Sequence, residues 1–221
     1  MKKTSPLTMV FILFVACLPI FYTWFIYTGL PSQIPLHFDI TGRPDRFGDK
    51  NRIWFSTLLL SAVSFGIYLL ITNLPKIDPK KTAGQSTGLY HKIATALVIF
   101  LCAISLIIIY SAKEGSIMLG HLLLPLLGLL YAVLGNYMHS IKPNYFVGFR
   151  TPWALENEEN WRRTHQLVGK IWVPGGLLLT VLTLLVPPKT GFILFFSLMM
   201  VMVIVPFVFS YRLYKKEQQL S

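Results

Sequence analysis

Charged residues are scarce in this chain, and acidic residues are scarcer than basic ones. Only 13% of the 221 residues are charged, with 9 Asp and Glu against 20 Lys and Arg. The 2 cysteines, Cys17 and Cys102, lie in apolar stretches, where a thiol acts as a small hydrophobic group and no disulfide is expected. No zinc-protease motif, nucleophile elbow, phosphate-binding loop or dinucleotide fingerprint occurs, so we predict no enzyme, no cofactor and no metal.

Charge is absent altogether from six stretches, which together suggest a membrane protein. A helix rises about 1.5 Å per residue, so roughly 20 apolar residues cross a hydrocarbon core of about 30 Å. Hydrophobic residues make up 54% of the chain, and the mean hydropathy is +0.59. Lipid offers the backbone no hydrogen-bond partner, and the alternation of barrel strands is missing, so the stretches should be helical. They cover residues 4–38, 53–75, 93–112, 115–141, 171–188 and 190–211.

The fold class predicted is therefore all-α: a polytopic membrane protein with six transmembrane helices. The net charge of +11 is explained by membrane topology and lipid headgroups, and direct contact with nucleic acid is not expected. Fourteen of the 20 Lys and Arg fall on the side of the two termini and six on the other. Because positive residues resist translocation, both termini are predicted to be cytoplasmic. The first apolar run is too long for a signal peptide, so we expect it to remain as a span.

Two connections between the spans carry 15 of the 29 charged residues. We divide the chain into an N-terminal helix hairpin, 1–75, and a four-helix region, 76–221. The N-terminal helix pair contains an external loop over 29–52, and the four-helix region contains a cytoplasmic segment over 139–170. Any functional site is expected in these two connections, because the spans themselves contain almost no ionisable side chains.

The cytoplasmic segment contains a helix-start signal. Thr151 is a good N-cap and Pro152 suits the first helical position, so a short interfacial helix is predicted over 152–165. Trp153 and Trp161 are expected to anchor this helix at the depth of the lipid headgroups.

The external loop should be ordered. Pro31 and Pro35 favour extended backbone, and residues 36–40 alternate between apolar and polar as in a short strand. A turn is expected over 41–44.

The loop's ionisable residues leave three interpretations open. His37, Asp39, Asp45 and Asp49 could hold a cation, although their spacing matches no zinc or calcium signature. Alternatively, Asp45 and Asp49 pair with Arg43, Arg46 or Lys50, while His37 forms a hydrogen bond within the loop. In the third interpretation, the loop is a recognition face for an external ligand.

Both connections resemble signature segments of the SdpI immunity-protein family of Gram-positive bacteria. Residues 30–45, LPSQIPLHFDITGRPD, are similar to the family segment LPxxIPxHFNxxGxxD and likewise follow the first span. Residues 144–155, NYFVGFRTPWAL, are similar to the second family segment, N-x-x-x-G-[IF]-R-T-P-W-T-L. The chain departs from the first pattern at Asp39, where Asn is usual, and this substitution adds a negative charge.

The resemblance implies a bacterial inner-membrane protein that protects the producing cell from a membrane-active toxin peptide, and in some members also holds a cytoplasmic repressor at the membrane. The expected partners are therefore membrane lipids, an external toxin peptide and a cytoplasmic repressor. In the external loop, the ligand-binding residues would be Pro31, Pro35, His37, Phe38, Asp39, Gly42, Arg43 and Asp45. In the cytoplasmic segment, either a partner-binding face or a structural junction would be formed by Asn144, Gly148, Arg150, Thr151, Pro152 and Trp153.

Two other classes of function stay open. One is a small transporter or channel whose motif loops act as gates, and the other is a signalling scaffold without an immunity role. The spans contain no pair of broken helices of the kind that marks a transporter site. His121 and His139 lie near opposite ends of the fourth span, where polar atoms reach headgroup water, so a proton relay is not favoured.

Overall fold

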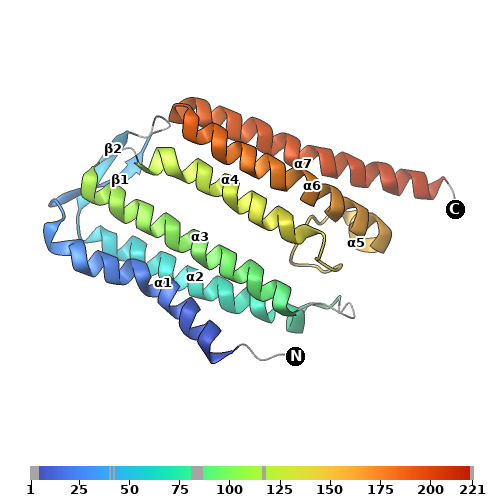
Figure 1. Cartoon of the computed structure of the whole chain (residues 1–221), viewed down its shortest axis with the longest axis horizontal. Helices are drawn as coiled ribbons and strands as arrows, with labels where there is room; N and C mark the ends of the chain where they lie inside the picture. The colour runs from blue at the N-terminus through green and yellow to red at the C-terminus, as the bar shows by residue number, and fades with distance from the viewer. Residues whose placement is uncertain (1–4, 40, 42, 81–86, 116–117, 220–221) are drawn as a thin grey trace.

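Long helices make up most of the computed structural model, which describes residues 5–39, 41, 43–80, 87–115 and 118–219 (Figure 1). Among these residues, six helices are long and apolar enough to cross a membrane, which confirms the predicted all-α polytopic fold. In chain order the elements are α1 (Pro6–Ile26), the 3-10 turn η1 (Tyr27–Gly29), β1 (Gln33–Phe38), β2 (Pro44–Asp49), α2 (Arg52–Ile77), α3 (Thr87–Glu114), α4 (Met118–Met138), α5 (Pro152–Glu156), α6 (Glu158–Leu185) and α7 (Pro188–Gln218).

The two motif-bearing connections lie at opposite ends of the bundle. In Figure 1 the long helices run side by side, with the β1–β2 hairpin at one end. The short helix α5 and both chain termini lie at the other end. The hairpin and the α5 segment therefore face opposite sides of any membrane that the bundle crosses.

The long helices pack in two groups of three. Helices α1, α2 and α3 contact one another, as do α4, α6 and α7, and α3 contacts α4 between the groups. In the first group, Ile12, Tyr68 and Val98 belong to a buried apolar cluster. In the second group, Phe195 and Met202 belong to another.

The seam between α4 and α6 is very close because small residues line it. A Cβ atom added to Gly176 would lie 2.5 Å from the carbonyl oxygen of Gly128 and 2.5 Å from the amide nitrogen of Ala132. Close backbone approach of this kind maximises van der Waals contact between helices in lipid. The hydroxyl of Thr180 adds a hydrogen bond of 3.1 Å to the carbonyl of Pro125 across the same seam.

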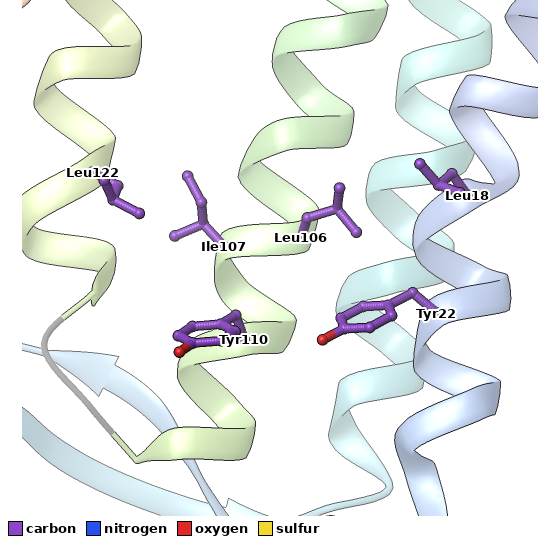
Figure 2. Close-up of a pocket in the computed structure, with 6 residues that line it drawn as sticks. All are labelled: Leu18, Tyr22, Leu106, Ile107, Tyr110 and Leu122. Atoms are coloured by element: carbon purple, nitrogen blue, oxygen red, sulfur yellow. The ribbon is translucent and has the colours of Figure 1, made fainter.

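The seam between α3 and α4 is looser. A cavity of about 550 Å³ lies at its hairpin end, and a smaller one of about 210 Å³ lies between the two helices further along. Figure 2 shows that the larger cavity takes its walls from three helices. Its lining residues are Leu18 and Tyr22 of α1, Leu106, Ile107 and Tyr110 of α3, and Leu122 of α4.

The interfacial helix predicted over 152–165 is divided in the structure. Helix α5 ends at Glu156, and Asn157 is extended, with φ −127° and ψ 118°. The Asn157 side chain accepts a hydrogen bond of 2.8 Å from the Asn160 amide and so caps α6. Residues 158–165 are therefore the first turns of the fifth long helix. The prediction was wrong there because it overlooked this second N-cap.

The expectation that Trp161 anchors the chain among lipid headgroups is also wrong. Its side chain is only 1% exposed, and its indole nitrogen donates a hydrogen bond of 2.8 Å to the Ile141 carbonyl. Trp161 lies in a buried cluster with Ile93, Met138 and Val168, which joins α3, α4 and α6 at the end of the bundle opposite the hairpin.

Candidate functional site

The loop over residues 29–52, which was predicted to be external, folds as an irregular two-stranded hairpin. Strands β1 and β2 pair antiparallel, and His37 lies opposite Arg46. One residue is inserted on each strand, Leu36 on β1 and Asp45 on β2. These irregularities bring the Nδ1 atom of His37 within 2.6 Å of the Asp45 carboxylate.

The sequence indicated only part of this hairpin. A strand was predicted over 36–40, whereas β1 occupies Gln33–Phe38. The second strand, β2, was not predicted, because its sequence contains Pro44, Gly48 and three charged residues, and such residues disfavour strands. Pairing with β1 therefore decides the conformation of β2.

The base of the hairpin is fixed to the helix ends. Leu30 and Ile34 are buried in a cluster with Ile53 of α2 and Ile109 and Ala112 of α3. This apolar base makes the hairpin a rigid part of the bundle surface, as expected for an ordered loop.

A network of polar contacts beside the base ties the end of α1 to the start of α2. The hydroxyl of Tyr27 donates a hydrogen bond to Asn51 Oδ1, and its ring lies 5.6 Å from that of Trp54, centroid to centroid. The Lys50 ammonium lies 4.9 Å from the centroid of the Tyr27 ring, within the range of a cation–π interaction.

Asp39 organises the far end of the hairpin. Its Oδ1 atom accepts hydrogen bonds from the Thr41 amide (2.8 Å), the Thr41 hydroxyl (2.6 Å) and the Arg43 amide (2.9 Å). The Thr41 hydroxyl, followed by the Arg43 amide, lowers the pKa of Asp39 below its usual value of 3.8. The carbonyl oxygen of an Asn could accept the same bonds, so the departure at Asp39 keeps the acceptor role. Gly42 lies outside the described residues.

A cavity of about 560 Å³ lies between the hairpin, the start of α2 and the neighbouring end of α3. Apolar side chains form much of its wall, including Ile34, Leu36, Phe38, Phe55 and Ile108. The remaining lining includes His37, Arg46, Arg52 and Ser56. The cavity therefore combines an apolar wall with cationic groups.

The two arginines of this lining have no acidic partner in the described part of the chain. Arg46 and Arg52 are exposed, and neither forms an ion pair with any residue that the structure describes. A guanidinium group binds carboxylates and phosphates through two parallel hydrogen bonds. The cavity is therefore suited to an amphipathic ligand that carries an anionic group.

The structure brings only some of the predicted loop residues to this cavity. Pro35, His37 and Phe38 line it, and Asp45 reaches it indirectly through its contact with His37. The other described members lie outside the lining: Pro31 is exposed before β1, and Asp39 and Arg43 lie at the turn.

Sequence reasoning missed Arg46 and Arg52, the two cations of the cavity. Arg52 was counted only as a positive charge that sets topology, and Arg46 was otherwise considered only as an ion-pair partner of Asp45 or Asp49. Arg52 is the last cation before the charge-free stretch of the second span, so it had to lie at a membrane surface next to the loop. That position was the available signal.

At the other end of the bundle, Asn144 is a structural centre for its loop. It is fully buried, and its Oδ1 accepts hydrogen bonds from the amides of Phe146 (2.8 Å) and Val147 (2.6 Å). Its Nδ2 donates to the carbonyls of Lys142 (2.9 Å) and Val147 (2.8 Å). All the usual hydrogen-bonding positions of this amide are therefore occupied within the loop.

The connection after α2 ties into the same loop. Asp78 is 2% exposed, and its carboxylate accepts a hydrogen bond of 3.1 Å from the Tyr145 amide. Lys80 donates a hydrogen bond from Nζ to the Leu155 carbonyl. These contacts join the two groups of helices at the end opposite the hairpin.

Gly148 brings the backbone against a buried histidine. Its φ is 113°, a conformation that side chains disfavour, and a Cβ atom would meet the ring of His165. The next amide, that of Phe149, donates a hydrogen bond of 3.0 Å to His165 Nε2. Since Nε2 accepts, Nδ1 carries the proton and donates to the Trp161 carbonyl at 2.9 Å.

Thr151 joins α5 to α7 through a buried polar network. Its hydroxyl accepts from the Ala154 amide at 3.2 Å, the predicted capping bond, and lies 2.8 Å from the Ser210 hydroxyl. The Ser210 hydroxyl donates to Asn160 Oδ1 at 2.7 Å, and Asn160 Nδ2 donates back to the Ser210 carbonyl at 2.9 Å. Thr164 donates to Asn160 Oδ1 as well, at 3.1 Å.

The remaining predicted residues of segment 139–170 lie nearer the surface. Trp153 packs against the rings of Phe207, Tyr211 and Tyr214 on α7. Arg150 is exposed and donates a hydrogen bond to the Tyr145 carbonyl, and Pro152 is exposed beside it. The segment is thus a buried junction with a small exposed face.

Comparisons with known proteins match both connections. The model of the SdpI/YfhL protein family matches residues 140–210, and that of a domain of unknown function (DUF1648) matches residues 14–61. The chain is 25% identical over 204 residues to the immunity protein SdpI of Bacillus subtilis (strain 168), covering 91% of this chain and 93% of that relative. No solved structure matches the chain.

The two matched regions contain the two ends of the bundle described above. Residues 14–61 include most of α1, the hairpin and the start of α2, and residues 140–210 include α5, α6 and most of α7. The motif resemblance, the six candidate spans and the similarity over nearly the full length agree with one another. This multi-pass membrane protein belongs to the SdpI/YfhL protein family.

Proposed function

We propose that this chain is a membrane immunity protein that protects its producing cell against a membrane-active toxin peptide. The relative from Bacillus subtilis, which is similar over 91% of this chain, is named an immunity protein. The observation that carries the proposal is the hairpin cavity, where an apolar wall meets the unpaired guanidinium groups of Arg46 and Arg52.

The proposal requires the hairpin to face the outside of the cell. Fourteen of the 20 basic residues lie on the side of the termini, which supports a cytoplasmic location for both ends. The hairpin lies at the opposite end of the bundle from the termini (Figure 1). In this orientation, in the bacterial inner membrane, the cavity opens where an external peptide first meets the lipid headgroups.

The chemistry of the cavity suits an amphipathic peptide. Its volume of about 560 Å³ can hold a few side chains of a peptide, but not a whole helix. Arg46 and Arg52 would bind a carboxylate, either an acidic side chain or the peptide's C-terminus. Phe55 and Leu36 would pack against apolar side chains of the bound peptide. A peptide held in this way at the helix ends is kept from inserting into the bilayer.

A survival assay tests the proposal. The chain is expressed in a bacterial strain that is sensitive to membrane-active peptides, and survival is compared for wild type, the Arg46→Gln/Arg52→Gln double variant and Lys189→Gln. Lys189 is the matched control, because it is an exposed cation at the same end of the bundle but outside the cavity.

We expect protection from wild type and Lys189→Gln and a large loss in the double variant. Normal membrane insertion without protection against any peptide would reject the immunity function. Protection that survives in the double variant would reject the cavity as its site. Peptide-independent solute flux in liposomes would instead favour the transporter alternative.

Labelling of introduced cysteines tests the orientation separately. With Cys17 and Cys102 replaced by Ser, single cysteines are placed at Ser32 beside β1 and at Tyr145 in the opposite connection. A membrane-impermeant maleimide added to intact cells should label position 32 and not position 145. Labelling of both positions, or of position 145 alone, would contradict the proposed orientation.

We also propose that the exposed face of the inner junction holds a cytoplasmic repressor. Tyr145 and Phe146 are 47% and 43% exposed, and Arg150 lies beside them through its bond to the Tyr145 carbonyl. Exposed aromatic rings with an adjacent Arg are typical anchors of protein interfaces. A fluorescently tagged DNA-binding repressor, expressed together with this chain, should move to the membrane when the toxin is added, and Tyr145→Ala/Phe146→Ala should prevent this movement. Recruitment that persists in the double variant would contradict the assignment of this face.

A further inference from the structure

A polar cavity unconnected with the hairpin lies between α4 and α6, at the end of the bundle that carries the termini. Its volume is about 500 Å³. Four exposed polar side chains line it: Asn136 and His139 at the end of α4, and Gln166 and Lys170 on α6. Gly135 and Gly169 form part of its floor, where their missing Cβ atoms let α4 and α6 approach closely: a Cβ on Gly169 would lie 3.0 Å from the Gly135 carbonyl oxygen.

The lining groups are mainly hydrogen-bond donors, and there is no carboxylate among them. The Lys170 ammonium, the two amide groups and the His139 ring can all donate. Within the part of the chain that the structure describes, none of these four side chains has a protein partner. A cavity with donors, one fixed positive charge and no acidic residue is suited to an anion.

The charge pattern along α6 and α4 indicates where the cavity lies across the thickness of the membrane. Lys170 is the last charged residue before the uncharged stretch 171–188, and His139 lies near the end of the uncharged stretch 115–141. Charged side chains at such positions reach the headgroup layer, while the residues beyond them lie in hydrocarbon. The cavity therefore lies at the lipid headgroups of one leaflet.

An apolar stripe continues from the cavity towards the middle of the membrane. Val173 lines the cavity itself, and Leu177 and Val181 follow at helical spacing on the same side of α6. Leu177 is 49% exposed and Val181 is 54% exposed, so lipid can contact both. A ligand bound here meets donors at its head and apolar side chains along its length.

We propose that this cavity binds the phosphate-bearing headgroup of an anionic phospholipid, with one acyl chain along Val173, Leu177 and Val181. Lys170 pairs with the phosphate, and Asn136, His139 and Gln166 donate to its oxygens or to the polar headgroup. The lipid belongs to the leaflet on the side of the termini, which is the cytoplasmic leaflet in the orientation proposed above. Basic cavities between helices on that side are known binding sites for anionic headgroups.

Lipid titration of the purified full chain tests the proposal. The protein, in a neutral detergent, is titrated with phosphatidylglycerol, phosphatidylcholine or soluble sn-glycerol 3-phosphate, and bound lipid is counted by native mass spectrometry. The variants are Lys170→Gln, Lys170→Arg and Lys76→Gln. Lys76 is the matched control, an exposed lysine at the same end of the bundle but outside the cavity, bonded to Asn73 at 2.6 Å.

We expect one phosphatidylglycerol to bind more tightly than phosphatidylcholine, and Lys170→Gln to weaken this binding roughly tenfold, as for loss of one hydrogen bond to a charged group. Lys170→Arg and Lys76→Gln should bind as wild type does. An equal loss of phosphatidylglycerol binding in Lys76→Gln would show that general surface charge, and not this cavity, binds the lipid. Unchanged binding in Lys170→Gln would overturn the proposal.

Two further outcomes would overturn the choice of ligand. Displacement of phosphatidylglycerol by an equal concentration of sn-glycerol 3-phosphate would indicate a site for soluble phosphates, because the acyl chain would then contribute nothing. Lys170-dependent binding of an acidic peptide, without phosphatidylglycerol binding, would indicate a protein partner instead. Each variant is checked by its thermal unfolding, which should match wild type because the substituted side chains are exposed.

Discussion

At the hairpin end of the bundle, Arg46 and Arg52 line a cavity and have no ion-pair partner among the described residues, whereas at the opposite end Asn144 and Asn160 are fully buried and each forms several hydrogen bonds. Both ends carry a motif, and both are rich in polar groups. The difference lies in whether those groups are already satisfied. A satisfied buried group contributes to stability, while an unsatisfied exposed one is free to bind a ligand.

This contrast separates two consequences of substitution. At the buried junction around α5 (residues 139–170), the removal of a polar or aromatic side chain leaves neighbouring buried groups unpaired, so we expect mainly a loss of stability. At the hairpin cavity, the removal of Arg46 or Arg52 leaves no described protein group without its partner, so we expect weaker ligand binding and little loss of stability. The predictions below test this separation.

The largest loss of stability is expected from Trp161→Ala. The substitution removes a fully buried ring and leaves the Ile141 carbonyl without its donor. Truncation of a buried Trp costs about 3–5 kcal/mol of unfolding free energy. Thermal unfolding in detergent, followed by circular dichroism, measures the effect. Trp24→Ala is the control: its side chain is 73% exposed on α1, and a comparable loss there would contradict the special role of the junction.

Asn160→Leu should have the next largest effect. It keeps the volume but removes the partner of the Ser210 and Thr164 hydroxyls, leaving buried groups unpaired. The expected cost is about 1–3 kcal/mol of unfolding free energy, measured by the same unfolding experiment. Asn136→Leu, an exposed Asn on α4, should change stability by less than about 0.5 kcal/mol. Equal effects of the two substitutions would show that the buried hydrogen-bond network does not contribute to the free energy of unfolding.

The hairpin cavity should respond to a change of shape without a loss of stability. Ser56 lines the cavity from α2, so Ser56→Phe places a ring inside it and should reduce protection against toxin in the survival assay. The unfolding temperature should stay unchanged or rise, because the ring fills empty space. Leu58→Phe adds a ring to the same helix at a position that is 50% exposed and outside the cavity, and it should leave protection intact. Full protection by Ser56→Phe would argue against the cavity.

The sequence predicted the spans well because lipid imposes a simple rule. Charge-free stretches must be helical where they cross lipid, and each of the six lies mostly or wholly within a long helix, although the end of the first stretch forms η1 and β1. The N-cap at Thr151 was also confirmed, since capping depends on local chemistry. These features need no knowledge of which segments meet in space.

Features that depend on distant contacts could not be predicted in this way. Strand β2 forms only because β1 lies beside it, and Trp161 is buried only because α3 and α4 close over it. The cavity needs Arg52 and Ile108, which are far apart in sequence, to meet at one site. Charge counting detected Arg52, but only its three-dimensional neighbours indicate a binding role.

The smallest effect is expected at the turn of the hairpin and concerns acid. The Thr41 hydroxyl and the Arg43 amide lower the folded-state pKa of Asp39 below 3.8, so the ionised carboxylate favours the folded turn. This contribution is fully present above the unfolded-state pKa and is lost as the pH falls through the folded-state pKa. The amides of Thr41 and Arg43 should therefore lose protection from hydrogen exchange, corrected for intrinsic rates, on acidification from about pH 5 to about pH 3.

In Asp39→Asn the protection of these amides should be independent of pH over this interval, because the Asn side chain accepts the same bonds without titrating. If the Thr41 and Arg43 amides of Asp39→Asn lost the same protection on acidification, a group other than Asp39 would cause the acid sensitivity.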